Sequence, residues 1–117
     1  MPLYEQTVKL YRPVGPKELE LIEQSGYSCF PPRLPEQPIF YPVTNEAYAS
    51  RISKEWNVPA YCSGYVTEFE VRKNFLKNYP VQNVGGENID EYWIPSEELG
   101  IFNKNIVGKI KVIRKFH

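Results

Sequence analysis

The segment from Pro31 to Val43, PPRLPEQPIFYPV, constrains the fold more than any other part of the chain. Five of its 13 residues are proline, which fixes φ and lacks a backbone hydrogen-bond donor. We therefore expect residues 31–38 to form a rigid, extended loop, because neither a helix nor a central strand accommodates them. Ile39 to Val43 predicts a short strand after this loop. A loop ordered in this way holds either the core beneath it or a ligand beside it, and the sequence leaves both open.

Length and charge limit the classes of protein to which the chain can belong. Its 117 residues predict one domain spanning the whole chain, residues 1–117. Acidic and basic residues number 14 each, so no global charge favours nucleic acid or an anionic membrane as a partner. Nine tyrosines fit either a β-rich core or the rim of a ligand groove or interface.

Cysteine and histidine are scarce, which argues against several kinds of site. Cys29 and Cys62 make neither a disulfide scaffold nor a metal-binding pattern, and we expect both to be free thiols. The single histidine, His117, is the last residue, so we expect no zinc site and no Ser-His or Cys-His nucleophile. No apolar run approaches the roughly 20 residues of a membrane span, and no signal-peptide pattern is seen. A cytoplasmic protein without a membrane partner is the expectation.

Hydrophobic periodicity predicts alternating strands and helices in the first half of the chain. Val8–Val14 reads as a strand, and Lys17–Gln24 as a helix that Ser25-Gly26 ends. Thr44 or Asn45 can cap a second helix, Asn45–Trp56, which we expect to end at Asn57 to Pro59.

Strands dominate the second half. Gly64–Val71 alternates with period two, so its Glu68 and Glu70 indicate a solvated strand face more than a carboxylate pair for acid–base chemistry. The remaining expected elements are a helical turn from Phe75, a strand Val81 to Val84, a turn at Gly85-Gly86, a strand Asp90–Pro95, a short helix capped by Ser96 and running to about Asn103, and a strand Ile106–Phe116. The whole chain is thus predicted to be one α+β domain, with an antiparallel or mixed sheet, two main helices and a short third.

Three segments carry a resemblance to a known fold. LYRPV with Arg12, PIFYPVTNEAYA with Tyr41 and Tyr48, and EYWIP with Glu91 follow the order of the ADP-ribosyltransferase-like fold. More closely, LYRPVGPKELELI, FPPRLPEQPIFYPV and EYWIPSEEL resemble small bacterial proteins labelled "ADP-ribosylation/crystallin J1". The resemblance covers nearly the whole chain.

The resemblance implies a set of site residues. In active members of that fold, a basic residue or histidine on the first strand holds NAD, a tyrosine or serine on the next strand-helix unit packs against nicotinamide, and a late glutamate orients the ribose and stabilises its developing charge. Arg12, Tyr41 and Tyr48 would then contact NAD, and Glu91 would be catalytic. The chain lacks the Ser-Thr-Ser signature of one branch and the first-strand histidine of another.

The residues also admit plainer interpretations. Arg12 can pair with a surface acid, Glu91 can be a surface residue at a strand entry, and the two tyrosines can be core. Arg33 is either a solvated loop charge or a cation that the proline loop presents to an anion.

Three functions therefore stay open. The chain is an NAD- or ADP-ribosyl-binding protein, with or without transferase activity; a non-catalytic accessory or immunity-type module that holds a protein partner in an aromatic groove; or a protein with another small ligand. For the first, we expect Arg12, Tyr41 and Glu91 to converge on a concave surface covered by the Pro31–Pro38 loop.

Overall fold

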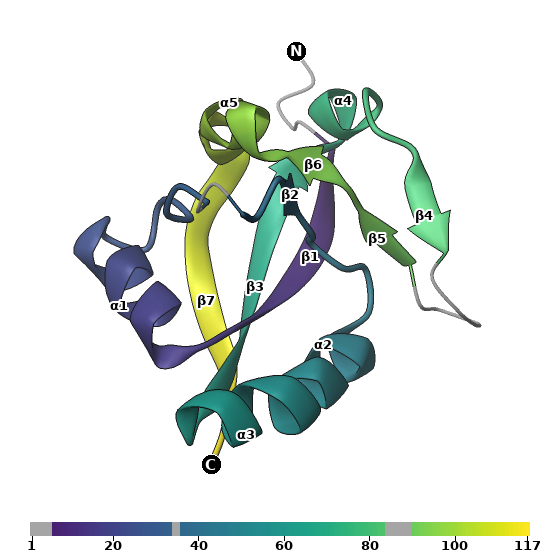
Figure 1. Cartoon of the computed structure of the whole chain (residues 1–117). Coiled ribbons are helices and arrows are strands. Elements are labelled where there is room, and N and C mark those ends of the chain that lie inside the picture. The colour runs from purple at the N-terminus through teal and green to yellow at the C-terminus, as the bar shows by residue number, and fades with distance from the viewer. Residues whose placement is uncertain (1–5, 34–35, 84–89) are drawn as a thin grey trace.

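The computed structural model describes residues 6–33, 36–83 and 90–117, which fold into a single α+β domain (Figure 1). In chain order its elements are β1 (Thr7–Val14), α1 (Pro16–Gln24), β2 (Ile39–Phe40), α2 (Glu46–Ile52), the π-helix η1 (Ser53–Asn57), α3 (Val58–Tyr61), β3 (Gly64–Arg72), α4 (Lys73–Leu76), β4 (Val81–Asn83), β5 (Asp90–Tyr92), β6 (Ile94–Pro95), the 3₁₀-helix η2 (Ser96–Glu98), α5 (Leu99–Lys104) and β7 (Ile106–Phe116).

A three-stranded antiparallel sheet, in the order β1-β3-β7, forms the centre of the molecule (Figure 1). Val43 extends this sheet, because it bridges Tyr11 of β1 on one side and Glu91 of β5 on the other. Paired backbone bonds of 2.8 Å between Tyr11 and Val43 fix the first of these contacts. The strand pair β4-β5 is thereby attached to the edge of β1 through Val43, which lies between β1 and β5.

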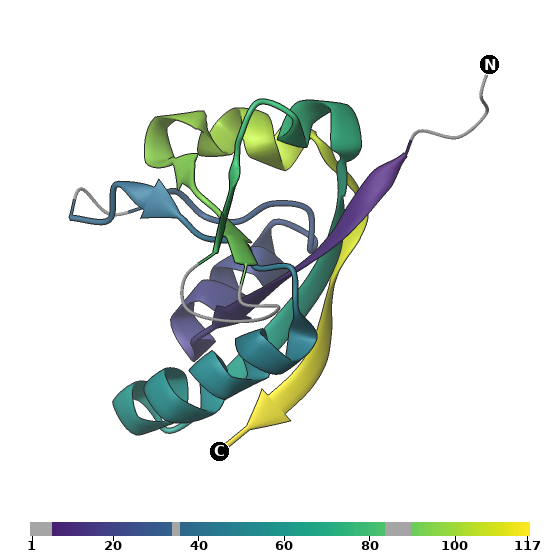
Figure 2. The ribbon, with the colours of Figure 1, turned by 90° about the vertical axis from the view of Figure 1, so that its right-hand side faces the viewer.

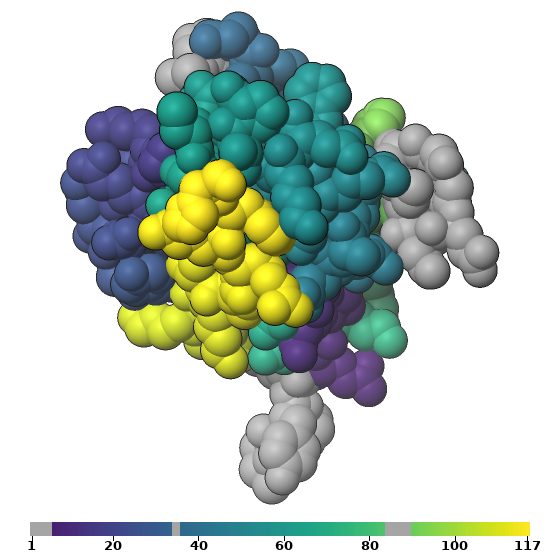
Figure 3. Space-filling view, turned by 90° about the horizontal axis from the view of Figure 1, so that it is seen from below, coloured from purple at the N-terminus to yellow at the C-terminus, as the bar shows by residue number. Residues whose placement is uncertain are grey.

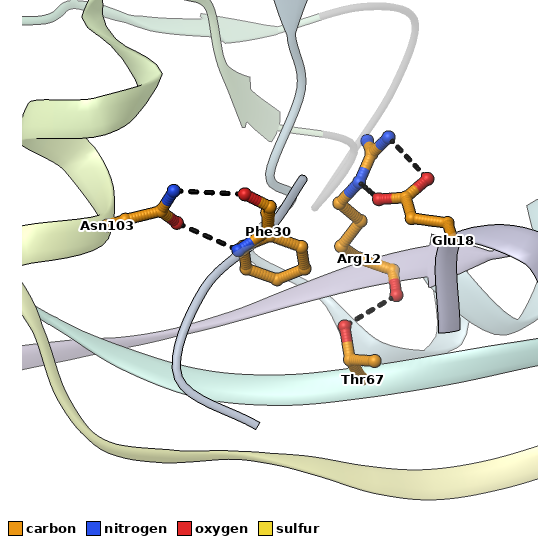
Figure 4. Close-up of polar contacts among 5 residues, drawn as sticks. All are labelled: Arg12, Glu18, Phe30, Thr67 and Asn103. Carbon is orange, nitrogen blue, oxygen red and sulfur yellow. Dashed lines mark hydrogen bonds and ion pairs between the residues drawn. The ribbon is translucent and has the colours of Figure 1, made fainter. Parts of the chain in front are cut away.

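The main core lies on one face of this sheet and is largely aromatic. Phe30 packs against Phe40 and Phe69 with ring centroids 5.0 and 4.8 Å apart, and Phe40 packs against Phe102 at 5.2 Å. The side-chain amide of Asn103 on α5 holds the backbone of Phe30 at both ends, accepting from its N–H at 2.9 Å and donating to its carbonyl at 3.0 Å (Figure 4). The entry to the proline-rich loop is therefore attached to the core.

A smaller core covers the opposite face beneath a helical arm. There Val43, Ala49 and Val66 are buried together, with Tyr48 packed against them. Figure 2 shows that α2, η1 and α3 run on as one continuous arm below the sheet. Seen from below, this arm lies beside the end of β7, where Lys54 Nζ is 5.0 Å from the ring of Phe116 (Figure 3).

Several predicted elements are confirmed within a residue or two. They are the strands predicted at Val8–Val14, Gly64–Val71 and Ile106–Phe116, the helix Lys17–Gln24, and the short helix near Asn103. Asn45 is the cap of the second helix, since its side chain accepts a hydrogen bond from the Tyr48 N–H at 3.0 Å. The strand pairs of the described residues are all antiparallel, so the sheet is not mixed.

The second helix does not end at Asn57 to Pro59 as its sequence suggested. It widens into the π-helix η1, which runs directly into α3, and Pro59 lies near the start of α3. The arm ends only at Cys62, which has a φ of 67°. Proline here starts a new turn and does not stop the helix.

The predicted strand Asp90–Pro95 is two strands that pair with different partners. β5 pairs with β4 and with Val43, whereas β6 pairs with β2. Trp93 lies at the break between them. The exchange of partners turns the chain at Trp93, a change that a local sequence pattern does not reveal.

The predicted cap at Ser96 and the predicted solvated face of Glu68 and Glu70 differ from the structure, and the predicted turn at Gly85-Gly86 is not described by it. Ser96 is not a cap: it is the first residue of η2, and no side chain caps that helix. Glu68 is half-buried and bonded to Tyr11, whose pKa is raised by burial and by this carboxylate, while Glu70 is exposed. The predicted turn at Gly85-Gly86, and Val84 before it, lie outside the described residues.

Candidate ligand groove

Two adjoining hollows lie beside β1. The first compartment, of about 450 Å³, is lined by residues that include Tyr41, Glu91 and Trp93. The second compartment, of about 510 Å³, is lined by residues that include Lys17, Glu18, Pro31, Arg33 and Tyr61. Arg12, Pro13 and Asn57 line both compartments. The two hollows are therefore halves of one groove, which we call the β1 groove.

The β1 groove exists because β1 continues past Val43, the residue that bridges its outer edge. Among the described residues, the outer edge of β1 is bridged only at Tyr11, and Arg12 and Pro13 follow without a paired strand on that side. Proline at this position needs no partner for a backbone donor. The helical arm closes the other wall, because Ile52 and Asn57 face the same space.

Arg12 is the best-fixed residue of the groove. Its side chain leaves β1 on the main-core face, is 8% exposed, and places its guanidinium carbon 4.5 Å from the centre of the Phe40 ring. Nε donates to one oxygen of Glu18 at 2.8 Å and Nη2 donates to the other at 3.2 Å (Figure 4). The Thr67 hydroxyl donates to the Arg12 carbonyl at 2.9 Å. The acid partner that the sequence allowed for Arg12 is thus Glu18, and this pair does not use Nη1.

Arg33 adds a second guanidinium beside the same ring. Its carbon lies 5.9 Å from the centre of Phe40. Burial lowers the pKa of Arg33, the charge of Arg12 lowers it further, and Glu18 acts in the opposite direction. One half-buried carboxylate thus faces two guanidinium groups, which leaves the second compartment with an excess of positive charge.

An aromatic pair and a carboxylate form the wall of the first compartment. The rings of Tyr41 and Trp93 meet edge to face with centroids 6.3 Å apart, and they are 39% and 43% exposed. The indole Nε1–H of Trp93 donates to Glu91 Oε1 at 2.7 Å. Glu91 is 9% exposed, so this bond holds a nearly buried carboxylate in one orientation.

Of the residues proposed from the sequence, Arg12, Tyr41 and Glu91 line the first compartment and Arg33 lines the second. Tyr48 is not among the lining residues of either. It packs against the smaller core, and the guanidinium carbon of Arg51 lies 5.3 Å from its ring centre. Burial, and then the nearby charge of Glu91, raise the pKa of Tyr48. Tyr48 therefore occupies the core position that its sequence also allowed.

Sequence reasoning missed two residues of the groove. Trp93 could have been found, because residues two apart in a strand point the same way and Trp93 follows Glu91 at that spacing. Asn57 gave no such signal, because it lies where the sequence suggested only the end of a helix. Its Nδ2 is buried without a hydrogen-bond partner.

Comparisons with known proteins do not assign the chain to a family: no family model matches it, and no curated protein matches it. Within residues 6–33, 36–83 and 90–117 no helix is long and apolar enough to span a membrane. The same residues hold no cluster of three or more His, Cys, Asp or Glu side chains suited to a metal ion. Cys29 and Cys62 are both exposed and unbridged.

Proposed function

We propose that the β1 groove binds NAD or a related ADP-ribosyl compound, and that the domain is ADP-ribosyltransferase-like. The observation that carries this proposal is that a guanidinium, an aromatic pair and an oriented carboxylate line one compartment, contributed by Arg12, Tyr41 with Trp93, and Glu91. Those groups match the phosphate, the flat nicotinamide ring and the ribose of NAD. The compartment's volume of about 450 Å³ lies within the usual range of small-molecule sites.

The chemistry follows from the charges. When the bond between the ribose C1′ and nicotinamide breaks, its electron pair leaves with nicotinamide and positive charge develops on the ribose. The Glu91 carboxylate stabilises that charge, while the Trp93 indole fixes the carboxylate's orientation. The oxygen of water or of an acceptor hydroxyl then bonds to C1′ and releases its proton to solvent. Glu91 contributes to the rate because the charge exists only near the transition state.

In this proposal Arg12 binds a phosphate group while it stays paired with Glu18. A phosphate oxygen can take the Nη1 donors while Glu18 keeps Nε and Nη2. Phe40 beneath the guanidinium fixes its plane, so little further ordering is needed on binding.

Calorimetric titration with NAD and ADP-ribose tests binding. Wild type should bind both, and Arg12→Lys, which keeps the charge and loses the planar fork, should bind about ten- to a hundredfold more weakly. Arg51→Gln removes a cation that lines neither compartment and should bind as wild type does. Absence of binding by wild type at millimolar ligand would overturn the NAD proposal.

Turnover is tested separately with Glu91→Gln, which keeps the side chain's size. This variant should bind NAD with nearly unchanged affinity and should lose NAD consumption. Equal consumption by Glu91→Gln and wild type would remove Glu91 from the catalytic role. A wild type that binds NAD and never consumes it would leave a binding protein without transferase chemistry.

A second candidate, a module that holds a protein partner, is favoured by exposed aromatic residues. Trp56 and Tyr61 on the helical arm are 71% and 58% exposed, and the ring pair Tyr41 and Trp93 is also open to solvent. Tyrosine and tryptophan are, with arginine, enriched among the residues that carry most of the binding energy of protein interfaces. This candidate predicts that wild type binds neither NAD nor ADP-ribose, which is the opposite result in the same titration.

A further inference from the structure

Two buried side-chain donors in the described residues have no hydrogen-bond partner, namely Arg33 Nε and Asn57 Nδ2. Both residues line the second compartment. More than about 90% of buried polar groups in proteins are paired, and an unpaired one destabilises the fold. Two such donors beside one hollow indicate that the hollow is arranged for something other than stability.

The fold uses an unusual local structure to place Asn57 there. Asn57 is the last residue of the π-helix η1, a type of helix that is rare and frequent at functional sites. The arm packs so tightly on the start of β3 that a Cβ at Gly64 would lie 2.8 Å from Asn57 Cβ and 2.3 Å from Ser53 Oγ. Only glycine at position 64 allows this approach, so both features serve to bring Asn57 to the junction of the two compartments.

The charges around the second compartment define what it can accept. Its charged lining residues are three cations, Arg12, Lys17 and Arg33, and one carboxylate, Glu18. Lys17 Nζ lies 3.7 Å from Oε2 of Glu20, which does not line the hollow. Positive charge thus exceeds negative charge among the lining side chains, and the donors of Arg33 and Asn57 are unpaired. A ligand group that complements both features is anionic and rich in hydrogen-bond acceptors, as phosphate oxygens are.

We propose that the second compartment is a site for a phosphate or diphosphate group, to which Arg33 and Asn57 donate hydrogen bonds. The proposal rests on the proposed function in one respect, since it assigns the diphosphate of an NAD-like ligand to this compartment. It reaches further in making Asn57 a binding residue. It also makes the site selective for phosphate esters over nicotinamide or its riboside alone.

The test uses inorganic pyrophosphate, ADP and NAD as probes, with binding measured by calorimetry. Wild type should bind all three. Asn57→Leu and Arg33→Gln should each bind pyrophosphate and ADP about ten- to a hundredfold more weakly, because each loses a hydrogen bond to a charged group. The control Arg51→Gln lowers the net charge by the same amount as Arg33→Gln and should leave all three affinities unchanged.

A readout without ligand separates a binding role from a structural one. Asn57→Leu removes an unpaired buried amide from a helical arm, so its melting temperature should rise by a few degrees while its affinity falls. Asn57→Ala, which fits any pocket that holds asparagine, should show the same loss of affinity. A structural role would instead lower the melting temperature of both variants and leave their affinity for pyrophosphate unchanged, and that result overturns the proposal.

The probes also separate this proposal from the function on which it rests. If wild type binds NAD but neither pyrophosphate nor ADP, the phosphate site is wrong and the proposed function stands. If wild type binds pyrophosphate and ADP but not NAD, the phosphate site stands and the NAD function is wrong. If it binds none of the three, both are wrong.

Discussion

Asn103 and Asn57 are two asparagines whose amides lie in opposite situations. The Asn103 amide is bonded at both ends to the backbone of Phe30, with distances of 2.9 and 3.0 Å (Figure 4). Nδ2 of Asn57 is also buried, yet it has no partner. A paired buried amide adds stability and an unpaired one subtracts from it. The difference separates a region built for stability, around Phe30, from a region that keeps donors available, along the β1 groove.

Aromatic residues divide in the same way. The rings of Phe30, Phe40, Phe69 and Phe102 are closed off from solvent and pack on one another. The rings of Tyr41 and Trp93 form a pair of similar geometry, but they are open to solvent in the first compartment. Because burial supplies most of the energy of a ring contact, the closed rings should decide stability and the open pair should decide binding.

Removing one ring from each region should give the largest contrast. Phe30→Ala should lower the free energy of unfolding by about 3–5 kcal/mol, since it leaves a cavity among closed rings. Tyr41→Ala should lower it by less than about 1 kcal/mol, because the ring is already exposed. Urea unfolding of the two variants measures both values. Equal losses would show that the groove is as much a part of the core as Phe30 is.

Exchanging each asparagine for leucine should give effects of opposite sign. Asn103→Leu leaves the N–H and the carbonyl of Phe30 without their partner and should cost about 2–4 kcal/mol. Asn57→Leu should raise the stability instead. The two variants unfolded in urea under the same conditions provide matched controls for each other. A loss of stability in both would contradict the distinction between the two regions.

Removing the carboxylate that faces Arg12 should lower the free energy of unfolding and raise the affinity for phosphate ligands. Glu18→Gln weakens the partner of a nearly buried guanidinium and should cost about 1–2 kcal/mol in the absence of ligand. It also removes a negative charge from the wall of the second compartment, so pyrophosphate and ADP should bind more tightly.

Glu20→Gln is the matched control for Glu18→Gln, because Glu20 is on the same helix and does not line the groove. It should change neither stability nor affinity by a measurable amount. Weaker binding of pyrophosphate by Glu18→Gln would contradict the assigned role of the carboxylate.

Tyr79, which packs against the main core, gives a smaller test through the pH dependence of stability. Burial, together with its hydrogen bond to Glu98, raises the pKa of Tyr79 from 10.0 to about 12. The fold favours the neutral phenol, so its contribution to stability is complete below pH 10 and is lost as the pH rises through about 12. The difference in unfolding free energy between wild type and Tyr79→Phe should therefore shrink over that range. A difference that stays constant with pH would contradict the raised pKa of Tyr79. Tyr61→Phe, at an exposed tyrosine, is the control for the loss of a hydroxyl.

Local patterns in the sequence were enough to predict most of the elements. The period-two alternation of Gly64–Val71 and the capped helix that begins after Asn45 are local properties, so they can be read without the rest of the chain. The π-helix and the break at Trp93 could not be predicted. The first depends on how closely Ser53 approaches Gly64, and the second on an exchange of strand partners, both of which are long-range contacts.

The candidate site was predicted in part for a similar reason. Chain order suggested that Arg12, Tyr41 and Glu91 would meet, and all three line the first compartment. The pairing of Arg12 with Glu18 depends on the turn between β1 and α1, and Asn57 depends on the widened helix. Contacts that arise from packing and not from spacing along the chain are the ones that sequence reasoning could not supply.

The two tryptophans of the chain make the most direct test of the account, because one lines the β1 groove and the other does not. In a titration of ¹⁵N-labelled protein with NAD, followed by the indole N–H signals, Trp93 should shift and Trp56 should stay in place. The reason is that the indole of Trp93 is bonded to Glu91 inside the first compartment, whereas Trp56 is 71% exposed and lines neither compartment. If the Trp93 signal does not move at millimolar NAD, or if Trp56 alone moves, the β1 groove is not the site of an NAD-like ligand.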